Sequence, residues 1–236
     1  SRRWARSARS SSSEFRPPRR APRPAPPRDG RTLSPAGRIP RLLFLPGAGA
    51  SALFWRPVAA RLGSGRPAHF FAWPGLGNEP ADPDVGGIDD LVALVLAELD
   101  QPADLIAQSM GGLVAIKAAL AAPGKVRRLV LAATSAGVPV ADLGGADWRA
   151  DYRRSFPNAA AWITEPQPDL SAELGRIAAP TLLLWGDADP VSPAAVGRRL
   201  QALLPDARLH IVAGGDHDLA VTHAAEVAPM IAAHLG

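Results

Sequence analysis

From residue 41 onward, short apolar runs alternate with longer stretches in which apolar residues recur at helical spacing. Strands without polar alternation, separated by helices, are typical of a sheet that is buried on both faces. The pattern therefore predicts an α/β fold with a doubly wound, mostly parallel sheet of about six strands and helices on both faces. The apolar runs predict strands at 41–45, 69–72, 104–108, 128–133, 181–185 and 209–212. The stretches between them predict helices at 52–62, 87–99, 110–122, 193–204 and 219–234.

Residues 135–176 interrupt this alternation, because they contain several prolines and no clear strand. Ligands in such folds bind outside the carboxyl ends of the strands. We therefore expect a short, mostly helical insertion that lies over the strand ends as a lid. The expected organisation is an α/β core formed by 41–134 and 177–236, with the lid inserted at 135–176.

Residues 1–40 differ from the rest of the chain in charge. They hold eleven arginines and two acidic residues, a net charge of +9, and the total of +4 leaves −5 for residues 41–236. The segment is rich in Arg, Pro and Ser and lacks apolar periodicity, so we expect a disordered tail. A transit peptide, or a tail that contacts anionic partners, are the alternatives. Because the positive charge belongs to this tail, we do not expect the folded domain to bind nucleic acid.

Composition narrows the class of protein further. Hydrophobic residues make up 47% of the chain, which is enough for a large buried core. The sequence has no cysteine, which excludes disulfides and thiol catalysis and favours a cytoplasmic location. No uninterrupted apolar run reaches the roughly 18 residues of a membrane span, so we expect none. Nothing in the sequence indicates the oligomeric state.

The most informative turn follows the predicted strand at 104–108. The strand ends in QSMGG, and a helical pattern begins at once. A sharp strand-to-helix turn of this kind exposes a serine hydroxyl and directs the next N–H groups at the space beside it. The backbones approach closely there, so small residues are needed, and Ala107, Gly111 and Gly112 provide them. The turn makes Ser109 a candidate nucleophile.

A serine hydroxyl needs a base that removes its proton, and a third group must orient that base. Two later strands end in suitable residues: one runs into Asp187 and Asp189, and the next runs into His217. The carboxyl ends of parallel strands meet at one edge of a sheet, so these groups are expected near Ser109.

Four motifs occur in order along the chain: LFLPGAGAS, IAQSMGG, LLLWGDADPVSP and AGGDHD. With them, residues 41–236 resemble the serine hydrolases of the α/β-hydrolase fold, of the esterase or thioesterase type with a short lid. The resemblance implies that Ser109 is the nucleophile, Asp189 the acid and His217 the base. It also implies that Ala48 and Met110 donate the N–H groups of an oxyanion hole.

Two assignments have alternatives. Asp189 is preferred over Asp187 because it stands in the G-x-x-D-P pattern of the family, but the two lie two residues apart. His210 and His223 compete weakly with His217, because one lies inside a predicted strand and the other within the last predicted helix.

Three features depart from the family's pattern. Pro46-Gly47 stands where His-Gly is common, and Ala107 occupies the first position of G-x-S-x-G. The two N-terminal strands that are usual in the family have no counterpart, because residues 1–40 do not read as strands.

The expected reaction is hydrolysis of a small-molecule carboxylic ester or thioester through an acyl-enzyme, with no cofactor and no metal site. Activity should fall below about pH 6.5, where an ordinary imidazole becomes protonated. Non-hydrolytic chemistry by the same triad, as in an acyltransferase or lyase, is an alternative, and so is a non-enzymatic ligand-binding protein. The candidate substrate contacts are Trp55, Trp148 and Tyr152.

Overall fold

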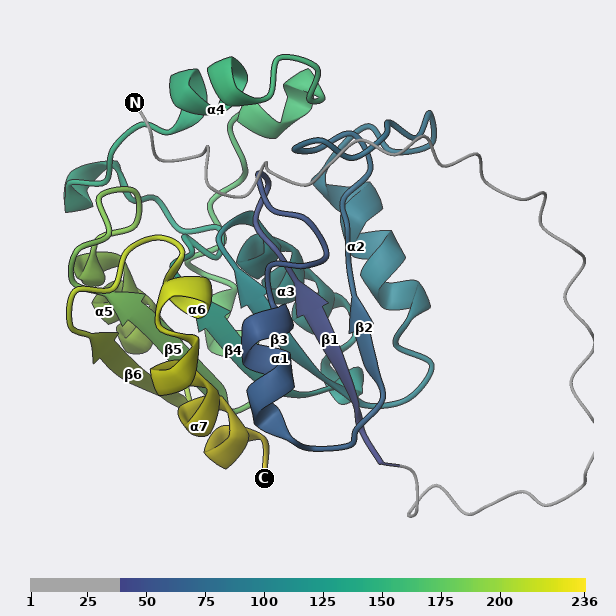
Figure 1. Cartoon of the computed structure of the whole chain (residues 1–236), viewed down its shortest axis with the longest axis vertical. Coiled ribbons are helices and arrows are strands. Elements are labelled where there is room, and N and C mark those ends of the chain that lie inside the picture. Colours follow the sequence, from purple (N-terminus) through teal and green to yellow (C-terminus); the bar gives the residue numbers. More distant parts are fainter. Residues whose placement is uncertain (1–38) are drawn as a thin grey trace, which may run out of the picture.

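The computed structural model describes residues 39–236, so the tail predicted for residues 1–40 lies almost entirely outside the described range. A single sheet of six parallel strands forms the centre, in the spatial order β2-β1-β3-β4-β5-β6 (Figure 1). The predicted fold class is confirmed, and every predicted strand is present. The strands are β1 (Arg41–Leu45), β2 (Ala68–Phe70), β3 (Ala103–Gln108), β4 (Val126–Ala132), β5 (Thr181–Gly186) and β6 (Ala207–Val212).

Helices cover both faces of this sheet (Figure 1). One layer consists of α2 (Ile88–Ala97), α3 (Met110–Ala121) and α5 (Ala194–Leu203). The other layer consists of α1 (Arg56–Leu62), α6 (Leu219–Thr222) and α7 (Ala224–Leu235). A 3-10 turn, η2 (Pro123–Lys125), connects α3 to β4.

The two hydrophobic cores are built from alternate residues of the same strands. In β1, Leu43 and Leu45 pack toward α2 and α3, whereas Leu42 and Phe44 pack toward α1 and α7. Successive side chains of a strand point to opposite faces, so a strand covered on both faces must be apolar throughout. This is why the sequence RLLFL has no polar alternation.

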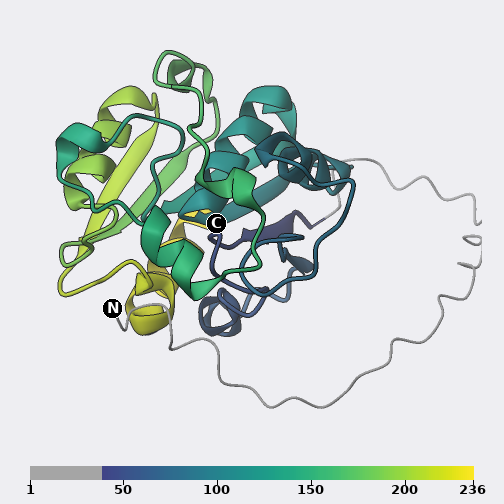
Figure 2. The same ribbon diagram turned by 90° about the horizontal axis from the view of Figure 1, so that it is seen from above.

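The segment from 135 to 176, called the insertion below, contains no strand. Its only α-helix is α4 (Arg149–Ser155), and it also holds the 3-10 turns η3 (Ala141–Leu143), η4 (Ala161–Thr164) and η5 (Leu174–Arg176). The part around α4 lies beyond the carboxyl ends of the strands, as the side view and the view from above both show (Figures 1 and 2).

Two helix boundaries differ from the prediction. The helix predicted from 52 begins at Arg56, because the Ser51 hydroxyl accepts the N–H of Leu53 and so stabilises a turn instead. The last predicted helix is two helices, since His223 leaves the helical conformation between α6 and α7 at φ −118°. No helix among residues 39–236 is long and apolar enough to cross a bilayer.

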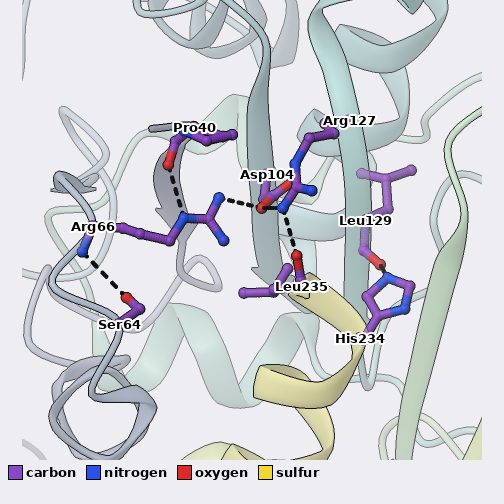
Figure 3. Close-up of polar contacts among 8 residues, drawn as sticks. All are labelled: Pro40, Ser64, Arg66, Asp104, Arg127, Leu129, His234 and Leu235. Carbon is purple, nitrogen blue, oxygen red and sulfur yellow. Dashed lines mark hydrogen bonds and ion pairs between the residues drawn. The ribbon is translucent and has the colours of Figure 1, made fainter. Parts of the chain in front are cut away.

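The amino end of β3 holds a buried ion cluster (Figure 3). The carboxylate of Asp104 has no exposed surface and accepts from Arg127 at 2.8 and 2.6 Å, and Arg66 forms a second ion pair with it. Arg66 also donates to the carbonyl of Pro40 at 2.8 Å, and Arg127 donates to that of Leu235 at 2.6 Å. The cluster therefore ties the entry to β1, two central strands and the end of α7 together.

Candidate active site

The turns that follow β1, β3, β5 and β6 lie at one edge of the sheet, where the strands end (Figure 1). The chain passes from β1 outward to β2 and then back to β3 on the other side of β1, so the turns after β1 and β3 are neighbours. In parallel sheets such a change of direction opens a crevice for ligands.

The turn between β3 and α3 is strained at Ser109. Its backbone has φ 53° and ψ −124°, which residues other than glycine rarely adopt. Strain of this kind marks functional sites, and a serine on a strand-to-helix turn presents its hydroxyl outward.

The glycines after Ser109 are required by close contacts. A Cβ at Gly111 would lie 2.5 Å from the carbonyl oxygens of Leu45 and Pro46, and one at Gly112 would lie 2.4 Å from the hydroxyl of Thr134. The first turn of α3 therefore packs directly on the loop after β1 and on the end of β4. The sequence argument that small residues are needed here is confirmed.

The structure brings Ser109, His217 and Asp189 into one hydrogen-bonded chain. Nε2 of His217 lies 3.1 Å from the Ser109 hydroxyl, and its Nδ1 lies 2.8 Å from the Asp189 carboxylate. An ionised carboxylate only accepts hydrogen bonds, so Nδ1 carries the proton and Nε2 is left to accept from the serine. The arrangement is able to take a proton from Ser109.

Asp189, and not Asp187, contacts His217. The Asp189 side chain is fully buried, and its other oxygen accepts the N–H groups of Val191 and Ser192 at 2.8 and 3.0 Å. These bonds fix the carboxylate in one orientation. Asp187 instead accepts the N–H of Gly214 at 2.7 Å and so holds the turns after β5 and β6 together.

A second carboxyl, Asp218, lies close enough to His217 and Asp189 to interact with their charges. Burial raises the pKa of Asp218 above its ordinary value. The charge of protonated His217 opposes this shift, whereas the negative charges of Asp216 and Asp189 add to it. The site therefore disfavours a further negative charge.

The loop after β1 faces the serine turn. A Cβ at Gly47 would lie 2.5 Å from the side-chain oxygen of Gln108 and 3.1 Å from Cβ of Ser109. Within residues 39–236, nothing accepts a hydrogen bond from the N–H of Ala48 or Met110. Hydrogen bonds among these residues therefore leave both N–H groups unused, and their role in an oxyanion hole stays a prediction.

The three predicted substrate contacts lie in different surroundings. Trp55 is 1% exposed in the core beneath α1, and its indole donates to the carbonyl of Leu45 at 3.2 Å. Tyr152 is also 1% exposed, whereas the half-buried Trp148 packs edge-on against it. Contact of any of the three with a substrate stays a prediction.

The other histidines lie outside this hydrogen-bonded chain. His210 is 3.8 Å from Glu226, and His223 contacts the hydroxyl of Thr222 at 2.9 Å. His234 contacts the carbonyl of Leu129 at 3.0 Å, and burial lowers its pKa.

Sequence reasoning missed the contribution of Gln108. This buried side chain donates to the carbonyl of His217 at 3.1 Å and so connects the histidine turn to the serine turn. The only signal was a polar residue at the carboxyl end of a strand whose other polar residue, Asp104, lies near its amino end.

Comparison with known proteins agrees with this geometry. Residues 42–163 match the family described as "Alpha/beta hydrolase family", and residues 138–224 match the "alpha/beta hydrolase fold". A pimeloyl-[acyl-carrier protein] methyl ester esterase of Photobacterium profundum is 28% identical over 234 residues, covering 78% of this chain and 90% of the relative. The corresponding esterase of Neisseria meningitidis serogroup C is 29% identical over 233 residues, covering 79% and 90%.

A solved structure shares the fold. The meta-cleavage product hydrolase of Pseudomonas fluorescens superposes with a TM-score of 0.70 at 19% identity, covering 84% of this chain and 91% of that chain. The family match extends over more than half of this sequence, and relatives and fold agree with it. The chain is therefore a member of the alpha/beta hydrolase family and an enzyme of the hydrolase type.

Proposed function

We propose that the chain hydrolyses a small-molecule carboxylic ester or thioester through an acyl-enzyme on Ser109. The observation that carries this proposal is the hydrogen-bonded chain from Asp189 through His217 to the Ser109 hydroxyl. A relative named as a methyl ester esterase supports an ester as the substrate.

In the first half of the reaction, Ser109 Oγ attacks the carbonyl carbon while Nε2 of His217 takes its proton. The N–H groups of Ala48 and Met110 donate to the oxyanion of the tetrahedral intermediate. The intermediate collapses, His217 gives the proton to the departing alcohol or thiol, and the acyl group stays on Ser109. The buried carboxylate of Asp189 holds the imidazole in the required tautomer and stabilises its charged form.

In the second half, water takes the place of the alcohol or thiol. His217 removes a proton from the water as it attacks the acyl carbon, and the same two N–H groups hold the new oxyanion. Collapse releases the carboxylic acid, and the proton on His217 returns to Ser109. The free enzyme is thereby restored with its original protonation.

We also propose that the insertion serves as a short lid, with 41–134 and 177–236 as the core. The position of α4 beyond the strand ends supports this role, because a substrate at Ser109 would enter from that side (Figure 2).

The test combines labelling with turnover. A fluorophosphonate probe should label wild-type protein at Ser109, as shown by peptide mapping, and Ser109→Ala should take up no label. Wild-type protein should hydrolyse members of a p-nitrophenyl ester series, and kcat should fall at least about 1000-fold in Ser109→Ala. A folded wild-type protein that neither labels nor turns over any ester would contradict the proposal. Labelling followed by acyl transfer to an added alcohol in preference to water would favour a transferase.

A further inference from the structure

Aromatic side chains from three segments bind carbonyl groups at the end of β1 and in the loop that follows it. The indole of Trp55 donates to Leu45 at 3.2 Å, and the indole of Trp73 donates to Pro46 at 2.8 Å. The third donor is the hydroxyl of Tyr152 in α4, which donates to the carbonyl of Ala48 at 3.1 Å. The loop that contains the Ala48 N–H is thus bound by side chains that lie outside the loop.

The Tyr152 hydroxyl has two backbone partners. Besides donating to Ala48, it accepts the N–H of Gly77 at 3.0 Å. Tyr152 is 1% exposed, so water does not compete for these bonds. Burial raises the pKa of Tyr152, which keeps the hydroxyl protonated and able to donate at every pH at which the enzyme would work.

The peptide that follows Ala48 lies beside both Tyr152 and Gly77. Gly77 has φ +58°, and a Cβ there would lie 3.4 Å from the Ala48 carbonyl oxygen and 3.6 Å from the carbonyl carbon of Gly49. This peptide has the hydroxyl of Tyr152 as its hydrogen-bond donor and the backbone of Gly77 as a close neighbour. It therefore has little freedom to rotate.

The loop needs such support because its own sequence is permissive. Its residues, Pro46-Gly47-Ala48-Gly49-Ala50, include two glycines, which resist backbone rotation least. The N–H and the carbonyl of Ala48 belong to two peptides that meet at one Cα. Holding the carbonyl fixes one of these two peptides, and the N–H of the other can then change direction only by rotation about the two backbone bonds of the Ala48 Cα.

We propose that Tyr152 is a positioning residue for the oxyanion hole, through which the insertion sets the direction of the Ala48 N–H. This inference rests on the proposed function, since it assigns that N–H to the oxyanion. It gives Tyr152 a role other than substrate contact. Within residues 39–236, no other side chain of the insertion is hydrogen-bonded to this loop. A displacement of α4 would therefore act on the Ala48 N–H through Tyr152.

The test is Tyr152→Phe, which removes the hydroxyl and keeps the ring. Loss of one oxyanion donor costs about 100- to 1000-fold in kcat, and a donor that is present but badly held should cost about 10- to 100-fold. We expect KM for a p-nitrophenyl ester to change by less than about three-fold, because the ground-state contacts remain. The inhibition constant of phenylboronic acid, which forms a tetrahedral adduct on the serine, should rise in step with the loss of kcat.

Thr181→Val is the matched control. It also removes a buried hydroxyl that donates to a backbone carbonyl, that of Ala179 at 3.0 Å, but at the amino end of β5. It should lower the melting temperature by an amount similar to that of Tyr152→Phe and leave kcat unchanged. Equal falls of kcat in the two variants would overturn the proposal, because they would reflect stability alone.

Two further outcomes are decisive. A folded Tyr152→Phe with kcat within about two-fold of wild type would overturn the positioning role while leaving the proposed function intact. If wild-type protein itself neither labels nor turns over, the proposed function fails and the positioning role falls with it. If Tyr152→Phe does not fold, Gly77→Ala replaces it, since a side chain is strained at φ +58° and the strain falls on the backbone whose N–H the Tyr152 hydroxyl accepts. Unchanged kcat in that variant would overturn the proposal.

Discussion

The two ends of β3 differ in whether their polar groups have partners in the part of the chain that the structure describes. At the amino end, the buried charge of Asp104 is bound by two arginines, which in turn bind carbonyls from the entry to β1 and the end of α7 (Figure 3). At the carboxyl end, Ser109 is held in a strained conformation and two nearby N–H groups have no acceptor within residues 39–236. The charged side chains of the ion cluster at the amino end are all paired, whereas two N–H groups at the carboxyl end have no acceptor among these residues.

The amino end of β3 contributes to the stability of the fold, whereas its carboxyl end carries the groups that are candidates for catalysis. A fully paired charge cluster resists change because each partner depends on the others. An unpaired N–H and a strained serine cost stability, so they are retained only where something else uses them. The contrast makes separable predictions, since a change at one end should alter stability and a change at the other should alter rate.

The largest stability effect is expected from Asp104→Asn. The substitution removes a buried carboxylate from the nearly buried Arg66 and the partly exposed Arg127, and it should lower the free energy of unfolding by about 3 kcal/mol. Urea denaturation measures this loss, while kcat of the remaining folded protein should stay near that of wild type. Asp100→Asn is the control, because its pair with Arg41 is long, at 3.8 Å, and exposed, and should contribute less than about 0.5 kcal/mol. A large loss of kcat without unfolding would break the comparison.

Gly111→Ala should affect both properties, with its main effect on rate. The new methyl group would meet the carbonyls of Leu45 and Pro46 at 2.5 Å, so the serine turn and the loop after β1 must separate. A displacement of about 1 Å in a catalytic site costs about 100-fold in kcat/KM, and overpacking costs about 1–3 kcal/mol of stability. Steady-state kinetics and denaturation measure the two.

The control for this change is Gly124→Ala in η2, where a Cβ would meet nothing within 4 Å. Its stability should lie within about 0.5 kcal/mol of wild type and its kinetics should be unchanged. If Gly111→Ala has the same stability and kinetics as Gly124→Ala, close packing of the serine turn does not determine the position of Ser109.

The smallest effect is expected from Asp218→Asn and depends on pH. Because folding raises the pKa of this carboxyl above 3.8, the folded state binds its proton more tightly than the unfolded state. Its ionisation therefore costs stability as the pH rises through the folded pKa, and below 3.8 the cost is absent. Asp218→Asn should raise the melting temperature at pH 8 and leave it unchanged at pH 3, whereas the exposed Asp84→Asn should change it at neither pH.

The sequence predicted most of what local chemistry determines. The six strands and the serine turn were readable because apolar runs and the QSMGG turn are signals within a few residues. The start of α1 was wrong because Ser51 binds a nearby N–H as a turn residue, and that choice depends on where the loop after β1 must go. The break at His223 in the last predicted helix was likewise missed, because no glycine or proline there indicates it.

The contacts that join distant segments could not be predicted in the same way. Tyr152 lies 104 residues from the carbonyl it binds, and Gln108 lies 109 residues from its partner. Aromatic residues in the insertion read equally well as substrate contacts, core or loop supports. Only the folded positions of α4 and the loop after β1 distinguish these roles for Tyr152.

The register of β1 and β3 has a consequence for how the chain can change length. Leu45 pairs with Ala107 across the two strands, and Ala48 and Met110 each follow their paired residue by three positions. Two neighbouring parallel strands, about 4.8 Å apart, thus deliver two N–H groups after turns of equal length. An insertion or deletion of one residue in either turn would shift one N–H relative to the other. The insertion between β4 and β5 has no such counterpart, so its length is free to vary wherever the residues that hold α4 in place are kept.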